Sequence, residues 1–281
     1  MIRTRLTYHS PSRLADAVEL LSEYAADAAV VGGGTMLIPR MTRAEVTVTH
    51  VVDPRGLGLD AISVHQGHVE LGARVTYTDL LRSEPLRKVL SLFPHVAAGI
   101  TGGEQIRNQG TIGGSACFAN PASDIPACLV AVNARMRVEG SNGTRDIDAQ
   151  DFFLDAFRSA VRPDEILTSI VVPRRRLRVG YCKLKLGESS WPIATAVALV
   201  DATARDASVT LGGVQRRPLR IDLGPLLDSE GKVMLGEIEV FVRARVTEPW
   251  QDVLAPGEYR HHVSGVVARR ALEGLQELEQ Q

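Results

Sequence analysis

The spacing of hydrophobic residues divides the chain into short extended and helical segments. Near the N-terminus, apolar residues recur with a helical period from Leu14 to Leu21, and Ser10 and Pro11 are the expected N-cap and first helical residue. Short apolar runs predict strands at residues 6–8, 28–31 and 46–52. The first part of the chain therefore reads as strand, helix and two further strands, closed by a turn that begins at Asp53.

The next part combines hairpins with helices. Polar turns separate paired apolar runs at residues 61–65 and 68–71, and again at residues 135–138 and 144–147. A longer apolar run at 166–172 predicts a strand that Pro173 ends. Helices are predicted at residues 78–81 with Thr78 as the cap, and at 86–98, 125–132 and 149–157.

The last part begins after a run of three arginines at residues 174–176. Strands are predicted at 179–186, 193–200 and 207–211, followed by a helix from about 259 to 278. The pattern favours an α+β fold with three parts, residues 1–56, 57–173 and 177–281. The first two are α/β subdomains, and the third is a three-stranded antiparallel sheet with helices.

A glycine-rich loop follows the strand predicted at 28–31. Gly32, Gly33 and Gly34 have no Cβ, so several backbone N–H groups can point into one concavity and bind an anion. Thr35 can add a hydroxyl, and a diphosphate is the expected anion. A tight turn between strands is an equally good interpretation of this stretch alone.

The loop does not match the common nucleotide-binding patterns. A Rossmann loop has the glycine spacing G-x-G-x-x-G and opens a full crossover helix. Asp53 lies at a suitable distance for the ribose acid, but the glycine spacing differs and Pro39 falls in the first turns of the required helix. The strand predicted at residue 46 also begins too soon for a crossover. We therefore expect a different loop geometry.

A second loop, Gly110 to Ser115, repeats these features. Small residues again follow a turn, and we expect them to expose backbone donors around Thr111 and Gly114. Asp124 follows at a distance where its carboxylate can accept hydrogen bonds from ribose hydroxyls or a ring N–H. Its alternative role is the N-cap of the helix predicted at 125–132.

Composition and charge exclude several classes of protein. The net charge is -1, which argues against a nucleic-acid surface. No apolar run has the length of about 20 residues that a membrane span needs. Residues 1–5 lack the apolar core of a signal peptide, so we expect a cytoplasmic protein.

The chain has few residues suited to metal binding. Its three cysteines, Cys117, Cys128 and Cys182, are too scattered for a zinc site or an iron–sulfur cluster. Cys117 and Cys128 are interpreted as small buried hydrophobic residues. His65 and His68 flank a turn, and both are expected to be exposed and without a third ligand nearby. Any iron–sulfur or metal chemistry must come from another chain.

Three segments carry a resemblance to a known family: residues 31–39, 105–115 and 120–127. Weaker matches lie at residues 165–173, 181–183, 211–214 and 258–272. In these segments the chain resembles the FAD-binding medium subunits of molybdenum hydroxylases. That family includes the medium subunit of carbon monoxide dehydrogenase and the flavin domain of xanthine dehydrogenase. The resemblance covers nearly the whole chain.

The resemblance implies an FAD-binding fold of the PCMH (vanillyl-alcohol-oxidase-like) type, with FAD between the first two subdomains. The residues it assigns to the cofactor are Val31, Gly32, Gly33, Gly34, Thr35, Met36, Thr101, Gly110, Thr111, Gly114, Ser115, Asp124, Leu167 and Lys183. Both glycine loops would hold the diphosphate, so valine at Gly33 or Gly114 should block FAD in a folded protein. Asp124 would contact the flavin end, and Leu167 would pack on the ring.

Three further positions near the ring follow from the same resemblance. Lys183 would lie at the pyrimidine edge, although Lys185 is an equal candidate by sequence. Thr101 replaces a phenylalanine that some relatives place over the cofactor. Trp191 is a candidate for the aromatic residue usually found near the ring.

The resemblance also implies a function. The chain would be an electron-transfer flavoprotein subunit without a catalytic acid or base of its own. Its partners would be a small [2Fe–2S] subunit and a large molybdopterin subunit, in a heterotrimer or its dimer. The alternatives are a free-standing FAD-dependent oxidoreductase and a nucleotide-binding module without a redox role.

Overall fold

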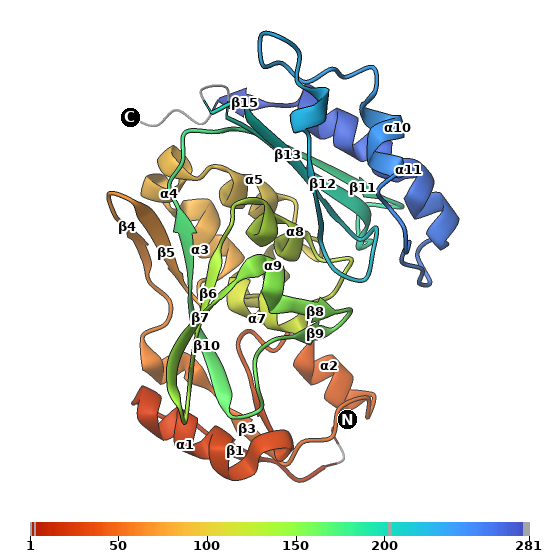
Figure 1. The fold of residues 1–281 in the computed structure, drawn as a ribbon. Helices are drawn as coiled ribbons and strands as arrows, with labels where there is room; N and C mark the ends of the chain where they lie inside the picture. The colour runs from red at the N-terminus through yellow and green to blue at the C-terminus, as the bar shows by residue number, and fades with distance from the viewer. Residues whose placement is uncertain (1, 3, 202–203, 278–281) are drawn as a thin grey trace.

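Three β-sheets of three or five strands follow one another along the molecule, with the N-terminal part at one end and the C-terminal part at the other (Figure 1). The structure, a computed structural model, describes residue 2, residues 4–201 and residues 204–277. Its α-helices are α1 (Leu14–Tyr24), α2 (Leu37–Thr42), α3 (Tyr77–Arg82), α4 (Glu84–Val89), α5 (Leu92–Ala98), α6 (Gly103–Gln109), α7 (Ile112–Phe118), α8 (Asp124–Ala131), α9 (Ala149–Phe152), α10 (Ile238–Arg243) and α11 (Gly257–Glu273). Within these ranges, no helix has both the length and the apolar surface to cross a lipid bilayer.

The first sheet is small and parallel. β3 (His50–Val52) lies between β1 (Thr7–His9) and β2 (Ala28–Val30). β3 starts later than predicted, which leaves room for α2 between β2 and β3. The prediction that the chain lacks a crossover here was therefore wrong. Pro39 is tolerated as the third residue of α2, where its missing N–H has no intrahelical partner.

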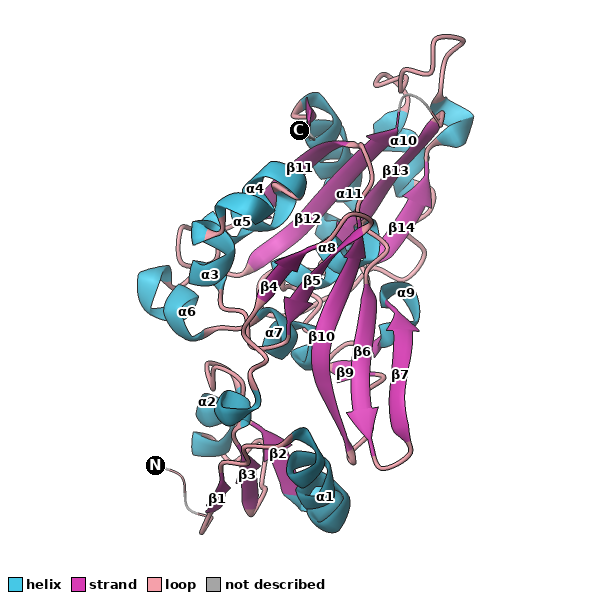
Figure 2. Cartoon of the chain, turned by 90° about the vertical axis from the view of Figure 1, so that its left-hand side faces the viewer, coloured by secondary structure: helices cyan, strands magenta, loops and turns pink. Residues whose placement is uncertain are grey.

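The second sheet is antiparallel and is built around one long strand, β10 (Glu165–Pro173). β5 (His68–Gly72) and β4 (Ile62–Val64) lie on one side of it, and β6 (Arg135–Gly140) and β7 (Gly143–Asp148) lie on the other. Both predicted hairpins, β4–β5 and β6–β7, are confirmed. Figure 2 shows β10, β6 and β7 extending from the middle of the molecule toward the N-terminal part.

The third sheet has five strands, so the prediction of three was wrong. Its order is β14 (Leu219–Asp222), β13 (Asp206–Gly212), β12 (Pro192–Asp201), β11 (Arg178–Lys185) and β15 (Gln276–Glu277). The two additional strands form the edges and are too short to show a clear alternation. The three predicted strands are the central three.

β12 explains how the second and third sheets pack together. Val197 and Leu199 belong to the hydrophobic core shared with α8, whereas the alternate residues Ala196 and Ala198 belong to the core shared with α11. Both faces of the strand are therefore covered. This accounts for an apolar run in the sequence without the usual polar alternation.

Two helices begin at positions other than those predicted. Arg13 is the N-cap of α1, so Ser10 and Pro11 lie before the helix. Thr76, and not Thr78, caps α3: Thr76 Oγ1 accepts a hydrogen bond from the Asp79 N–H, and the Asp79 carboxylate accepts one from the Thr76 N–H. This reciprocal capping box fixes the start of the helix.

Three predicted helices have different limits in the structure. The segment 86–98 is divided into α4 and α5, because Leu90 leaves the helical conformation. The segment 149–157 ends after α9 and continues as β8 (Phe153–Asp155), which pairs with β9 (Arg158–Ser159). The last helix, α11, runs from Gly257 to Glu273, and the predicted end at residue 278 lies outside the described residues. α6 was not predicted.

α11 carries a fully buried arginine. Arg260 is 0 % exposed, and its Nη1 donates hydrogen bonds to the carbonyls of Ile193 and Gly213. Its Nη2 lies 2.5 Å from Asp252 Oδ1. The guanidinium thus ties α11 to the ends of β12 and β13. A buried charge of this kind is tolerated because its partners replace the lost hydration.

Removing the Asp252 carboxylate should therefore destabilise the chain. We expect Asp252→Ala to lower the free energy of unfolding by about 3 kcal/mol, because it leaves a buried guanidinium without its counter-charge. Urea unfolding measures this change. The control is Arg269→Ala on the same helix, where the side chain is 45 % exposed, with an expected change below about 1 kcal/mol. Equal losses in the two variants would contradict the role of Asp252.

Candidate functional site

The two glycine loops lie in direct contact, although they are far apart in the sequence. A Cβ added to Gly33 would lie 1.8 Å from the carbonyl oxygen of Gln109, and one added to Gly32 would lie 2.9 Å from Thr111 Oγ1. Only glycine at these positions lets the two backbones approach this closely. The two loops, which the resemblance assigns to one cofactor, are therefore neighbours in the fold.

This contact changes the interpretation of Gly33. A side chain there would point at the backbone of the second loop and not into open space. The expectation that valine at Gly33 would block a ligand and leave the fold intact was therefore wrong. Gly114 differs, since the nearest atom to its added Cβ is Thr111 Oγ1, a side-chain atom at 2.8 Å.

The first loop has a run of free backbone donors. Val31 N–H donates to the Val52 carbonyl and extends the parallel sheet by one residue. Beyond it, the N–H groups of Gly32, Gly33, Gly34, Thr35 and Met36 find no acceptor in the described part of the chain. Gly34 has a φ of 69°, which redirects the backbone within this run. Unpaired amides in sequence form an anion-binding nest.

The second loop does not repeat this arrangement, so the expectation of a second set of exposed donors was wrong. Ile112 N–H donates to the Val75 carbonyl, and Gly113 N–H donates to the Ala73 carbonyl. Gly114 N–H donates to Thr111 Oγ1, which caps α7. The glycines here serve close packing, as at Gly110, where an added Cβ would lie 2.8 Å from the Tyr77 ring.

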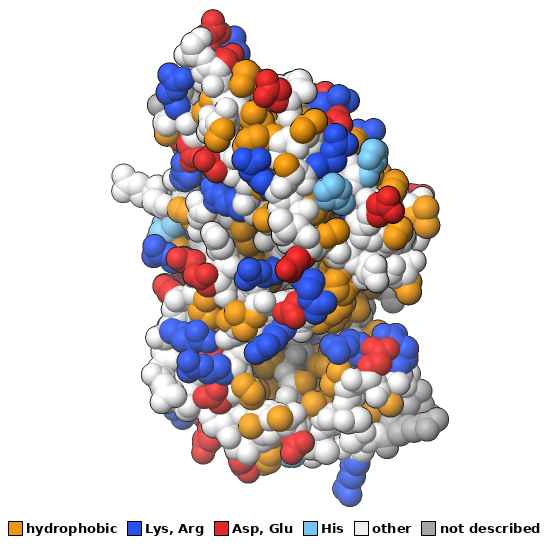
Figure 3. All heavy atoms as spheres, turned by 45° about the vertical axis from the view of Figure 1, so that its right-hand side comes forward, with side chains coloured by type: hydrophobic (Ala, Val, Ile, Leu, Met, Phe, Trp, Pro, Cys, Tyr) orange, Lys and Arg blue, Asp and Glu red, His pale blue; other side chains and the backbone are white. Residues whose placement is uncertain are grey.

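A cavity of about 500 Å³ opens where the two loops meet, within the range typical of small-molecule sites. The space-filling view shows the molecule hollowed in the lower half of one face, with hydrophobic and basic side chains near the rim (Figure 3). The predicted residues that line the cavity are Gly32, Gly33, Gly34, Thr35, Met36, Thr101, Thr111, Gly114, Ser115 and Asp124. Trp191 lines it as well.

Four predicted residues do not line this cavity. Val31 lies in the sheet extension, and Gly110 packs on Tyr77. Leu167 lines an adjacent cavity of about 250 Å³ on the other side of Gly32, Thr111 and Gly114. Lys183 lies behind Asp124 and is described below.

Several lining residues were not predicted, among them Arg40, Tyr77, Ile100, Ile106 and Phe118. Most are apolar residues whose sequence pattern indicates an ordinary core. The Tyr77 hydroxyl is hydrogen-bonded to Ser115 Oγ, which connects α3 to α7. Arg40 lies in α2, directly after the first loop. This position in the sequence was the one feature that could have identified it as a residue of the site.

Asp124 is the buried acid of the site. Its side chain is 4 % exposed, and it accepts hydrogen bonds from the Tyr181 hydroxyl and from Lys183 Nζ at 3.0 Å. Burial raises the pKa of the Asp124 carboxyl, and the Lys183 ammonium and the Tyr181 hydroxyl oppose that shift. Ser123 is the N-cap residue of α8 and Asp124 is the first helical residue, so the capping alternative was wrong.

The structure distinguishes the two candidate lysines. Lys183 Nζ donates to Asp124 and, at 2.9 Å, to the Gly99 carbonyl, and its side chain is 11 % exposed. Lys185 Nζ donates to the Glu188 carbonyl at 2.7 Å and is not near Asp124. Residues two apart in a regular strand share a face, but the register of β11 shifts between Leu184 and Lys185, and only Lys183 of the two bonds to the acid.

The cysteines near the site are poorly suited to reaction. Burial raises the pKa of the Cys117 thiol to about 12, and Cys117 lines the cavity. Cys128 is fully buried, and its thiol donates to the Asp124 carbonyl at 3.2 Å. Thiols that stay protonated are weak nucleophiles, so both behave as small hydrophobic residues.

A basic side chain lies at the cavity wall. The Arg40 guanidinium carbon is 5.6 Å from the centre of the Phe118 ring, and the side chain is 33 % exposed. Its Nε is 3.6 Å from Glu45 Oε2. The same carboxylate lies closer to Arg43, whose Nε is 2.5 Å from Glu45 Oε1. Arg40 is therefore a cation that is only loosely paired beside the anion-binding loop.

Comparison with known proteins agrees with this geometry. Residues 4–175 match the family described as the FAD binding domain in molybdopterin dehydrogenase. The chain is 33 % identical to the carbon monoxide dehydrogenase medium chain of Afipia carboxidovorans, with 97 % of each chain covered. It is 29 % identical to the nicotine 6-hydroxylase medium subunit of Paenarthrobacter nicotinovorans, with 95 % of this chain and 96 % of the relative covered.

A solved structure, reconstituted CO dehydrogenase from Oligotropha carboxidovorans, superposes with a TM-score of 0.90 at 32 % identity. That comparison covers 98 % of each chain. Sequence and fold thus agree over almost the whole chain. The chain therefore belongs to the family of FAD-binding domains in molybdopterin dehydrogenases, and it is a flavoprotein of the oxidoreductase class.

Proposed function

We propose that this chain is the electron-transfer subunit of a multi-subunit molybdenum hydroxylase. It would take electrons from [2Fe–2S] clusters of a partner chain and pass them to an external acceptor. The observation that carries this proposal is the run of unpaired amides at residues 32–36 beside a cavity of about 500 Å³. When bound, FAD supplies the ability to accept electrons singly or in pairs.

Different residues of the site would bind different parts of the cofactor. The amides of Gly32 to Met36 would hold the diphosphate, with Arg40 nearby as a cation and Ser115 as a hydroxyl donor. The second loop would act mainly as a wall, because its amides from Ile112 to Ser115 are paired. Thr101 and Trp191, which also line the cavity, would face the ring system in place of a stacked phenylalanine.

Asp124 would contact the flavin end of FAD. Lys183 would act on the flavin through this carboxylate, because its ammonium is already bonded to Asp124 and to the Gly99 carbonyl. The pair adds no net charge to the pocket when both groups are ionised. Leu167 would support the floor of the site from the adjacent cavity.

The partner chains follow from what this chain lacks. With three cysteines in its sequence, it cannot supply the four thiolates of an iron–sulfur cluster. The relatives are named as the medium chain or medium subunit of their enzymes. We therefore propose a small iron–sulfur subunit and a large molybdopterin subunit as partners, in a heterotrimer or its dimer.

We also propose residues 1–56, 57–173 and 177–281 as the domains of this subunit. Each of the three sheets falls within one of these ranges. The core that contains Val197 and Leu199 joins the second and third domains.

Valine at Gly114 should remove FAD without unfolding the chain. Gly114 is exposed on the cavity wall, and its new side chain would occupy ligand space. We expect loss of bound flavin, measured by absorbance after reconstitution, with a loss of about 1–2 kcal/mol in unfolding free energy. Gly33→Val should lower both flavin binding and stability more, because it separates the two loops. Gly236→Val, at an open position elsewhere, is the control, and flavin retained by Gly114→Val would contradict the site.

Loss of the Arg40 cation should weaken FAD binding. We expect roughly tenfold weaker binding in Arg40→Ala, because a charged hydrogen bond to phosphate is worth about 1.5 kcal/mol at a partly exposed position. Titration of the apoprotein with FAD at low and high salt measures this, and the variant should show the smaller salt dependence. The control is Arg245→Ala, which removes an arginine that stacks on Phe241 away from the cavity. Equal effects of the two variants would contradict the assignment.

Purification from the native source tests the subunit role. A tagged copy of the chain should bring along two further chains in a fixed ratio, together with FAD, iron and molybdenum. Gel filtration and metal analysis measure this. A chain that carries FAD, is recovered alone and is reduced directly by a small molecule would instead be a free-standing oxidoreductase.

A further inference from the structure

The tip of the β4–β5 hairpin brings together two histidines and a glutamate. His65 and His68 flank the turn, the His65 N–H donates to the His68 carbonyl at 2.9 Å, and the two rings stack with centres 4.5 Å apart. Glu70 lies two residues after His68, so both side chains are on the same face of β5. One ligand atom from each of the three residues lies within 4.8 Å of the others.

The expectation that the two histidines have no third ligand nearby was therefore wrong. Glu70 is close to His68 in the sequence, but the hairpin is needed to bring His65 to the same place. None of the three residues lines the cavity beside the glycine loops. The cluster is thus separate from the flavin site.

We propose that His65, His68 and Glu70 bind a divalent transition-metal ion of the zinc and copper class. Two imidazoles and one carboxylate are a common donor set for Zn²⁺, and imidazole favours Zn²⁺, Cu²⁺ or Ni²⁺ over Mg²⁺ or Ca²⁺. Three protein ligands leave a coordination position for water. His65 is exposed, so an ion can enter from solvent.

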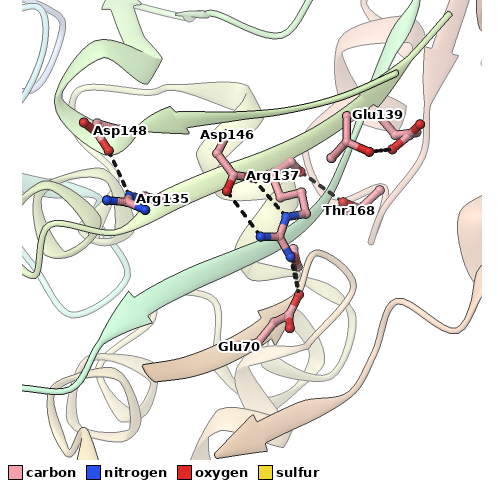
Figure 4. A network of polar contacts seen from close by, with 9 residues as sticks. Glu70, Arg135, Arg137, Glu139, Asp146, Asp148 and Thr168 are labelled. Atoms are coloured by element: carbon pink, nitrogen blue, oxygen red, sulfur yellow. Dashed lines mark hydrogen bonds and ion pairs between the residues drawn. The ribbon is translucent and has the colours of Figure 1, made fainter. Parts of the chain in front are cut away.

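Glu70 is held in place by residues behind it. Ser169 Oγ donates to Glu70 Oε1 at 2.6 Å, and Arg137 Nη1 lies 3.5 Å from the same oxygen. Figure 4 shows Arg137 between Glu70 and Asp146, and Asp146 accepts two hydrogen bonds from the guanidinium at 2.9 and 3.2 Å. Within the described residues these contacts use Oε1, which leaves Oε2 for the metal. Such supporting contacts orient a ligand and raise metal affinity.

The turn that carries the histidines is also fixed. The Arg174 N–H donates to the Gly67 carbonyl at 3.0 Å, and Arg174 Nη1 donates to the His65 carbonyl at 2.8 Å. The loop that follows β10 thus holds the hairpin tip from the other side. A bound ion would cross-link β4 and β5 at this tip, at the edge of the second sheet.

Metal titration of the full chain tests the proposal. The protein is prepared without a polyhistidine tag, treated with a chelator and titrated with Zn²⁺ in a calorimeter. We expect one ion per chain and a melting temperature that rises with Zn²⁺ concentration, because the ion binds the folded state. His68→Ala and Glu70→Gln should each lose this binding step, while the melting temperature in chelator and the FAD content stay unchanged.

The matched control is His50→Ala. His9 and His50 form the other contacting pair of imidazoles, with their ring nitrogens 2.8 Å apart, and they lie in the first sheet. This variant should bind Zn²⁺ as the unmodified chain does. Absence of binding in the unmodified chain would overturn the proposal, and so would binding that depends on His50 and not on His68.

A second variant tests the supporting contact. Ser169→Ala keeps all three ligands, and we expect it to weaken Zn²⁺ binding about tenfold through the loss of orientation at Glu70. Electron paramagnetic resonance of the Cu²⁺ form should report two nitrogen ligands, and this signal should be lost in His68→Ala. An unchanged Cu²⁺ spectrum in His68→Ala would show that the ion binds elsewhere.

Discussion

The contact between the two glycine loops is the constraint on which the rest of the site depends. Gly33 meets the Gln109 carbonyl at a distance that no side chain would permit. This close approach places the first loop against α6 and α7 while leaving its own amides unpaired. A cavity then forms beside a row of free donors. Any larger residue at Gly33 would separate the surfaces that create the cavity.

The two loops have different tasks despite their similar sequences. In the first, a run of N–H groups has no partner in the described residues and can bind an anion. In the second, the Ala73 and Val75 carbonyls accept the equivalent N–H groups and fix α7 to the preceding segment. One loop therefore keeps donors available for an anion, and the other supports the fold around it.

Charge in the pocket is balanced by side chains from distant parts of the chain. Asp124 at the start of α8 meets Lys183 and Tyr181 of β11, and these contacts join the second and third parts of the molecule beside the cavity. This arrangement holds a carboxylate in a buried place at modest cost. It supplies orientation and electrostatics but no nucleophile, in agreement with the raised thiol pKa of Cys117.

The sequence by itself determined the central strands, both hairpins and the positions of the two loops. These features follow from local periodicity and from glycine and turn residues, which report on neighbours along the chain. Tertiary structure alone decided which loop keeps free amides, that Lys183 and not Lys185 meets Asp124, and that Glu70 joins two histidines. Each of these depends on a hydrogen bond or a contact between segments that are remote in the sequence. A local sequence pattern does not identify a partner of this kind.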